Sequence, residues 1–81
     1  MTTYYYTFRS MTAALNATQK LKSRGINVKP LRTPEQLRKK GCGYCIPVEE
    51  ERMRKIRGAL LPTEYEKLYR SRDGMWEELD P

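Results

Sequence analysis

The sequence contains no histidine, so the side chain that most often moves protons near neutral pH is missing. No evident acid–base pair takes its place among the other residues. The chain has 81 residues, which is enough for one domain with a modest core. We therefore expect an accessory or binding protein more than a stand-alone enzyme.

Long apolar runs and targeting signals are absent as well. No stretch approaches the roughly 18 apolar residues that a membrane-spanning helix needs. The first ten residues, MTTYYYTFRS, lack the basic segment, apolar segment and cleavage site of a signal peptide. We expect a mature cytoplasmic chain that does not associate with membranes, and in that compartment a permanent disulfide is not expected.

Acidic residues are nearly absent from the first part of the chain. Residues 1–48 hold nine Lys and Arg but a single acid, Glu35, whereas residues 49–81 hold seven Lys and Arg against nine acids. The net charge of +6 is therefore concentrated toward the N-terminus. Such a surface is either a solvated basic face or a binding site for an acidic partner, such as nucleic acid or an acidic protein.

The N-terminal segments carry the clearest structural signals. The stretch TYYYTFR, Thr3 to Arg9, predicts a strand because aromatic residues and threonine favour strands. Strand alternation places two sets of side chains on opposite faces: Tyr4, Tyr6 and Phe8 against Tyr5 and Thr7. Ser10 occupies an N-cap position, and Gly25 ends the helix that follows.

The remaining segments predict a small α+β fold with a single-layer sheet. In order, we expect a strand at Ile26–Leu31, a loop at Arg32–Lys40, a strand at Tyr44–Val48, a helix from Glu49 to Leu61, a short helix from Thr63 and a tail. About three strands in β-α-β-β-α order would pack under two or three helices, as in half of a ferredoxin-like fold or a carrier protein. Residues 1–61 would form the domain, with residues 62–81 packed on it as a short helix and tail.

Cysteine is scarce, and both residues fall in the stretch GCGYCI, where two residues separate Cys42 from Cys45. In a parallel strand–helix–strand unit, the helix N-terminus lies at the same edge as the end of the second strand. An antiparallel third strand would start at that edge and bring Cys42 near the amides of Met11 and Thr12. Helix N-termini and nearby cations lower thiol pKa values. The cations expected nearby are Arg9, Arg32, Arg38, Lys39 and Lys40, and Gly41 and Gly43 would allow a tight, accessible turn.

Several interpretations of the two thiols remain open. Cys45 follows a strand pattern and fits either a buried position or the role of a second, resolving thiol. A thioredoxin-like redox couple needs the C-x-x-C motif at the start of a helix, whereas a strand follows here. Structural zinc needs four ligands, so it would require either a dimer that shares a four-thiolate site or additional carboxylate ligands. A nucleophile that forms a persulfide or selenosulfide needs a single activated cysteine.

The order of these motifs resembles a known family. Phe8-Arg9-Ser10 ends the first strand, Ala13-Ala14 lies in the helix, Gly25 makes the turn, Pro34 lies in the loop and Cys42-Gly43 forms the thiol motif. Over about residues 4–60, this arrangement resembles the small bacterial domain family of unknown function labelled putative selenium/sulfur carrier protein-like. The chain departs from the family pattern at Cys45, where an aliphatic or small residue is usual.

The resemblance implies a function for the thiols. Cys42 would be the carrier thiol, Cys45 a resolving thiol, and the partners would be the proteins that donate and accept sulfur or selenium, with no cofactor. Two other functions stay open: a small basic nucleic-acid-binding module that uses the tyrosines, or a non-catalytic interaction or regulatory protein with incidental cysteines. Free edges of a small sheet would also allow a homodimer.

Overall fold

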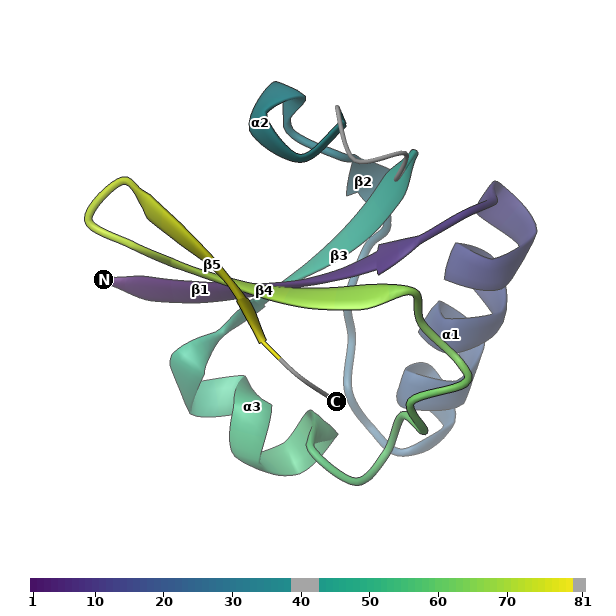
Figure 1. Cartoon of the computed structure of the whole chain (residues 1–81). Helices are drawn as coiled ribbons and strands as arrows, with labels where there is room; N and C mark the ends of the chain where they lie inside the picture. The colour runs from purple at the N-terminus through teal and green to yellow at the C-terminus, as the bar shows by residue number, and fades with distance from the viewer. Residues whose placement is uncertain (39–42, 80–81) are drawn as a thin grey trace.

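A five-stranded antiparallel sheet runs through the molecule, and helices lie on both of its faces (Figure 1). The computed structural model describes residues 1–38 and 43–79, apart from the side chains of Gln36 and Arg38. The strands are β1 (Thr2–Phe8), β2 (Leu31–Arg32), β3 (Tyr44–Glu49), β4 (Lys67–Arg72) and β5 (Met75–Leu79). Their order in the sheet is β2-β3-β1-β4-β5, so β1 is the central strand.

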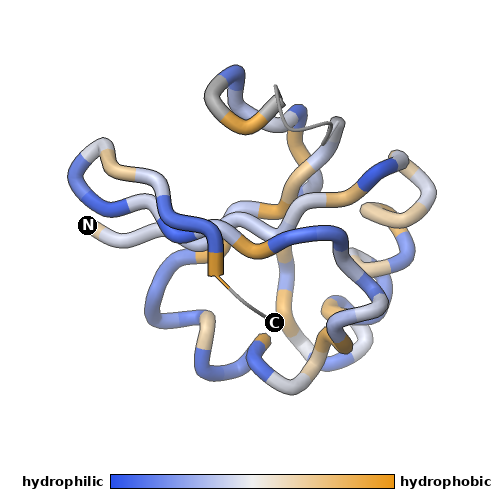
Figure 2. The backbone as a smooth tube through the Cα atoms, viewed as in Figure 1, coloured by the Kyte–Doolittle hydropathy of each residue, from blue (hydrophilic) through white to orange (hydrophobic). Residues whose placement is uncertain are grey.

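The helices divide the molecule into layers. The two longer ones, α1 (Met11–Ser23) and α3 (Glu50–Ile56), lie on one side of the sheet, and the one-turn helix α2 (Glu35–Arg38) lies on the other (Figure 1). Within residues 1–38 and 43–79, no helix has the length and apolar character needed to cross a membrane. Figure 2 agrees, because apolar residues occur in short stretches between hydrophilic ones.

The main core lies between the sheet and the two longer helices. Strand pairing aligns Tyr6 of β1 with Ile46 of β3, and Phe8 with Tyr44. The side chains buried in this layer include Tyr6, Phe8, Leu21, Ile46, Val48 and Ile56. Burying each such side chain contributes about 1.5–3 kcal/mol. The predicted alternation of β1 is confirmed, because Tyr6 and Phe8 face this core while Tyr5 and Thr7 point to the other side.

The three-stranded sheet in β-α-β-β-α order is wrong, although the α+β class holds. The segment expected as a strand at Ile26–Leu31 pairs only at its end, where Leu31 lies opposite Cys45. Ile26 and Val28 instead pack against the core, and Pro30 has no N–H to give to a strand partner. β3 lies between β1 and β2, so these two strands run in the same direction without touching.

The C-terminal part also differs from the prediction. No helix forms at Thr63–Glu66; the Glu64 carboxylate accepts a hydrogen bond from the Leu61 N–H at 2.8 Å and forms an ion pair with Lys20. These contacts close a turn that leads directly into β4, which pairs with β1 over six positions. The C-terminal segment that was expected to be a tail forms the strand β5 instead.

A tight turn at Asp73-Gly74 joins β4 to β5, and both residues have positive φ, at 51° and 81°. Arg72 pairs with Met75 across this two-residue connection. Positive φ at both central positions is the conformation of a type I′ hairpin turn, for which Asp-Gly is a favoured sequence. The dipeptide between two strand-like runs was therefore a usable signal for this hairpin.

Candidate functional site

The start of β3 lies beside the end of β1, at the edge where α1 begins. Phe8, the last residue of β1, pairs with Tyr44, the first residue of β3. Gly43 precedes Tyr44, and its carbonyl accepts a hydrogen bond from the Thr33 N–H at 3.2 Å. The topology therefore places the residue after Cys42 at the edge predicted from the sequence. Cys42 itself, together with Gly41, Lys39 and Lys40, lies outside the described residues.

The N-terminus of α1 has the predicted cap. Ser10 is extended, with φ −139° and ψ 159°, and its hydroxyl accepts a hydrogen bond from the Ala13 N–H at 3.1 Å. This cap takes the amide of Ala13 and leaves those of Met11 and Thr12 without a partner inside the helix. The unpaired amides and the helix dipole create positive potential at this end of α1.

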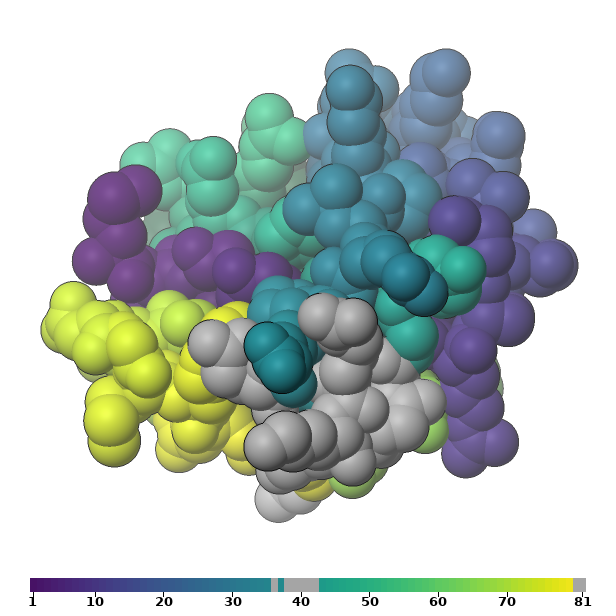
Figure 3. All heavy atoms as spheres, turned by 90° about the horizontal axis from the view of Figure 1, so that it is seen from above, coloured from purple at the N-terminus to yellow at the C-terminus, as the bar shows by residue number. Residues whose placement is uncertain are grey.

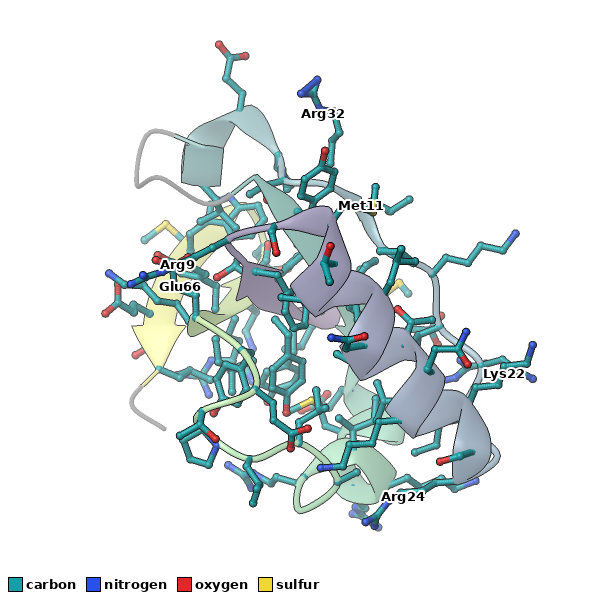
Figure 4. The ribbon with its side chains drawn as sticks, turned by 90° about the vertical axis from the view of Figure 1, so that its right-hand side faces the viewer. Arg9, Met11, Lys22, Arg24, Arg32 and Glu66 are labelled. Atoms are coloured by element: carbon teal, nitrogen blue, oxygen red, sulfur yellow. The ribbon has the colours of Figure 1, made fainter. Side chains whose placement is uncertain are left out.

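Two of the predicted cations can be placed at the same side of the molecule, as Figure 4 shows. Arg9 is exposed, and its Nε lies 3.2 Å from Glu66 Oε1, so an acid offsets part of its charge. Arg32 is also exposed, at the end of β2, and no acid of the described segments lies within ion-pair distance of it. Arg38 was also predicted as a nearby cation, but its side chain lies outside the described part of the structure.

Gly43 occupies an ordinary backbone conformation. Positive φ is found at Gly25, Gly58 and Gly74 but not at Gly43, and a Cβ atom added at Gly43 would meet nothing within 4 Å. The described conformation therefore sets no requirement for glycine at this position.

Cys45 is buried on the face of the sheet opposite α1 and α3. Its side chain is 1% exposed, and it lies across from Thr7 in the strand pairing. Its Sγ lies 3.9 Å from the carbonyl oxygen of Arg32, to which the thiol donates a weak hydrogen bond. Burial raises the pKa of Tyr5 on this face, and the neighbouring Cys45 adds to the rise. Of the two interpretations of Cys45, the buried position is the one that the structure describes.

The same face also packs side chains of β4 and β5, the strands that replace the expected short helix and tail. Tyr69 of β4 is 1% exposed, and its hydroxyl donates a hydrogen bond to Glu78 Oε1 at 3.4 Å. The rings of Tyr5 and Trp76 pack at a centroid distance of 4.9 Å. Figure 3 views the molecule from this side, with the β4–β5 hairpin and the start of α1 at opposite edges.

Thr33 is buried in this region, although the sequence predicted only a connecting loop there. It is 1% exposed, and its hydroxyl has no hydrogen-bond partner among the residues that the structure describes. It follows β2, two residues after Leu31, so strand alternation puts it on the same face as Leu31 and Cys45. A threonine in the connecting loop carries no sequence signal of burial.

Metal ligands do not gather in the described part of the chain. Within residues 1–38 and 43–79, no three side chains of Cys, Asp or Glu come together in a way that could hold a metal ion. The zinc alternative needed either a second copy of the chain or carboxylate ligands beside the two cysteines. The described geometry adds no ligands to it.

Comparison with known proteins gives one family. A family model described as "Putative Se/S carrier protein-like" matches residues 3–70, from β1 into β4. No curated protein and no solved structure matched the chain. A carrier-like family suggests that the protein interacts with partner proteins. Because the match covers most of the sequence, the chain belongs to the family of Putative Se/S carrier protein-like proteins.

Proposed function

We propose that this protein carries sulfur or selenium on Cys42 and passes it to a partner enzyme. The observation that carries the proposal is the family match over residues 3–70, because that range includes the whole C-x-x-C stretch. Family membership supports the carrier class. The identity of the thiol and the chemistry are our own inference from the residues around the start of β3.

The transfer is an exchange between thiols and needs no external oxidant. The Cys42 thiolate attacks the outer sulfur of a persulfide on a donor protein, and a new S–S bond forms to Cys42. The bond between that outer sulfur and the donor cysteine breaks, and the donor leaves as a thiolate. Transfer to the acceptor repeats the same exchange, and a selenosulfide donor reacts in the same way with selenium in the outer position.

The burial of Cys45 favours Cys42 as the accepting thiol. A donor persulfide must approach the attacking sulfur in line with the bond that breaks, and Cys45 is 1% exposed beneath this face of the sheet. Cys45 then fits the second role, in which its thiolate attacks the loaded Cys42. That step forms a Cys42–Cys45 disulfide and releases hydrosulfide, and a dithiol reductant would restore the two thiols.

Electrostatics at this edge support a reactive thiolate. The N-terminus of α1 and the guanidinium of Arg32, which has no acidic partner in the described segments, both favour negative charge nearby. Arg9 contributes less because Glu66 offsets its charge. The basic segment around residues 32–45 would also attract an acidic surface on the donor or acceptor, with a rate that falls as salt rises.

The test is the pH dependence of alkylation, followed by mass spectrometry in the natural protein, Cys42→Ser and Cys45→Ser. We expect Cys42 to react with a pKa well below the ordinary thiol value of about 8.5. Incubation with glutathione persulfide should then add one sulfur atom to Cys45→Ser and none to Cys42→Ser. An ordinary or raised pKa at Cys42, or a sulfur adduct that survives Cys42→Ser, would contradict the proposal.

A further inference from the structure

A pocket of about 310 Å³ opens on the helix side of the sheet, between the end of α3 and strands β1 and β4. This is the face opposite Cys45. Its polar lining comes from Tyr4, Tyr6, Arg57, Tyr65 and Arg70. Leu60, Leu68 and Leu79 supply an apolar lining. None of the lining residues that the structure describes is acidic.

The tyrosines form an ordered wall. The rings of Tyr6 and Tyr65 meet edge to face, with centroids 4.8 Å apart and an interplanar angle of 79°. Such a contact favours one relative orientation of the two rings. The tyrosines of β1 therefore lie on both faces of the sheet. Tyr5 packs on Trp76 on one face, and Tyr4 and Tyr6 line this pocket on the other.

Arg57 brings a positive charge that no acid of the described segments neutralises. It follows α3, and its N–H donates to the Met53 carbonyl at 2.8 Å, so the backbone is anchored where the side chain leaves the helix. The next residue, Gly58, has φ +129°, a conformation that other residues rarely adopt. Arg70, in contrast, forms an ion pair with Glu77. The pocket therefore has one guanidinium available and one already engaged.

The charge of Arg57 reaches the tyrosine wall. Burial and the neighbouring Tyr65 raise the pKa of Tyr6 to about 12, and the guanidinium of Arg57 opposes part of that rise. The Tyr6 hydroxyl is therefore neutral at physiological pH and can donate a hydrogen bond. An uncompensated guanidinium beside hydroxyl donors matches the needs of an oxyanion, which Arg binds through its planar pair of N–H groups.

We propose that this pocket binds a small molecule that joins an oxyanion group, a carboxylate or a phosphate, to an apolar body. Arg57 and the tyrosine hydroxyls hold the oxyanion, and the leucines contact the apolar body. The volume lies at the lower end of the range of about 300–1,000 Å³ that is usual for small-molecule sites. A benzoate-sized or phenyl-phosphate-sized ligand is therefore the right scale.

The experiment is an NMR titration of the full chain with benzoate, phenyl phosphate and benzyl alcohol. We expect saturable shifts of the Tyr6, Tyr65 and Arg57 signals with at least one of the two anions, and none with the neutral alcohol. The stronger binder of the two anions identifies the oxyanion. Absence of saturable shifts with both anions would overturn the proposal, as would equal binding of benzyl alcohol, which would make the pocket a purely apolar cleft.

Matched arginine variants locate the binding. Arg57→Met should weaken the better anion at least tenfold, whereas Arg24→Met removes the same charge from an exposed position outside the pocket lining and should leave binding unchanged. Equal weakening by both variants would show attraction by overall charge and would contradict a site at Arg57. Thermal unfolding of each variant, run in parallel, confirms that both stay folded.

Discussion

The two faces of the sheet bury side chains of different chemistry. The face under α1 and α3 buries apolar groups such as Phe8, Ile46 and Val48, which need shape but no hydrogen-bond partner. The opposite face buries Thr7, Cys45 and Tyr69, whose polar atoms must each find a partner. The first face therefore provides most of the stability, and the second face depends on particular pairs.

Thr7 and Thr33 show how far the second face meets that demand. The Thr7 hydroxyl donates to the Lys67 carbonyl and accepts from the Lys67 N–H, each at 3.1 Å, and so ties β1 to β4. The Thr33 hydroxyl, equally buried, has no partner within residues 1–38 and 43–79. An unpaired buried hydroxyl costs about 1–3 kcal/mol relative to a paired one. The fold tolerates that cost next to the proposed thiol site.

The largest loss of stability should come from truncating a side chain that is buried on the apolar face. Ile46→Ala should lower the free energy of unfolding by about 2–5 kcal/mol, because it removes buried methyl groups and leaves a cavity. Cys45→Ala, at the next residue and on the other face, should cost only about 1 kcal/mol, since it removes one sulfur atom. Urea denaturation under reducing conditions measures both. A larger loss for Cys45→Ala than for Ile46→Ala would reverse the comparison.

A pair of threonine variants should sharpen the contrast within the second face. Thr7→Val keeps the shape but leaves the Lys67 carbonyl and N–H unpaired, and should destabilise the protein by about 1–3 kcal/mol. Thr33→Val removes a hydroxyl that has no partner in the described part of the chain, and should be neutral or stabilising by about 1 kcal/mol. Thermal and urea unfolding of the two variants decides the matter. A clear loss of stability in Thr33→Val would mean that its hydroxyl is used in solution.

The last prediction concerns the ionisation of Tyr6. It should not affect stability at neutral pH and should lower it only under alkaline conditions. Its folded pKa of about 12 exceeds the ordinary value of 10.0, so the unfolded chain ionises first as the pH rises. The free energy of unfolding should be unaffected below about pH 9 and should fall from pH 10 toward 12, by at most about 1.4 kcal/mol per pH unit for this one group.

Tyr6→Phe is the control for that measurement, because it removes the titrating hydroxyl and keeps the buried ring. The slope of stability against pH should flatten in this variant, although Tyr5, whose pKa is also raised, will retain part of it. Identical slopes for Tyr6→Phe and the natural protein between pH 10 and 12 would show that another group controls the alkaline transition.

Part of the candidate site could be predicted because its signals are local. Ser10 was identifiable as a cap from its place before the helical pattern, and the start of β3 from the run Tyr44–Val48. The directions of the strands and of the helix were enough to place the start of β3 and the N-terminus of α1 at the same edge of the sheet. The burial of Cys45, by contrast, depends on what covers the second face, and neither Thr33 nor the pocket at Arg57 could be recognised from neighbouring residues.

The sequence by itself determined the short-range features of this protein: the alternation along β1, the caps of α1, the Asp73-Gly74 turn and the close spacing of the two cysteines. Only the tertiary structure decided that residues 67–79 become strands, because β4 forms by pairing with β1. Thr7 and Lys67 meet across a separation of 60 residues. Periodicity and capping act within a few positions, whereas strand pairing and the satisfaction of buried polar groups are settled only when distant segments come together.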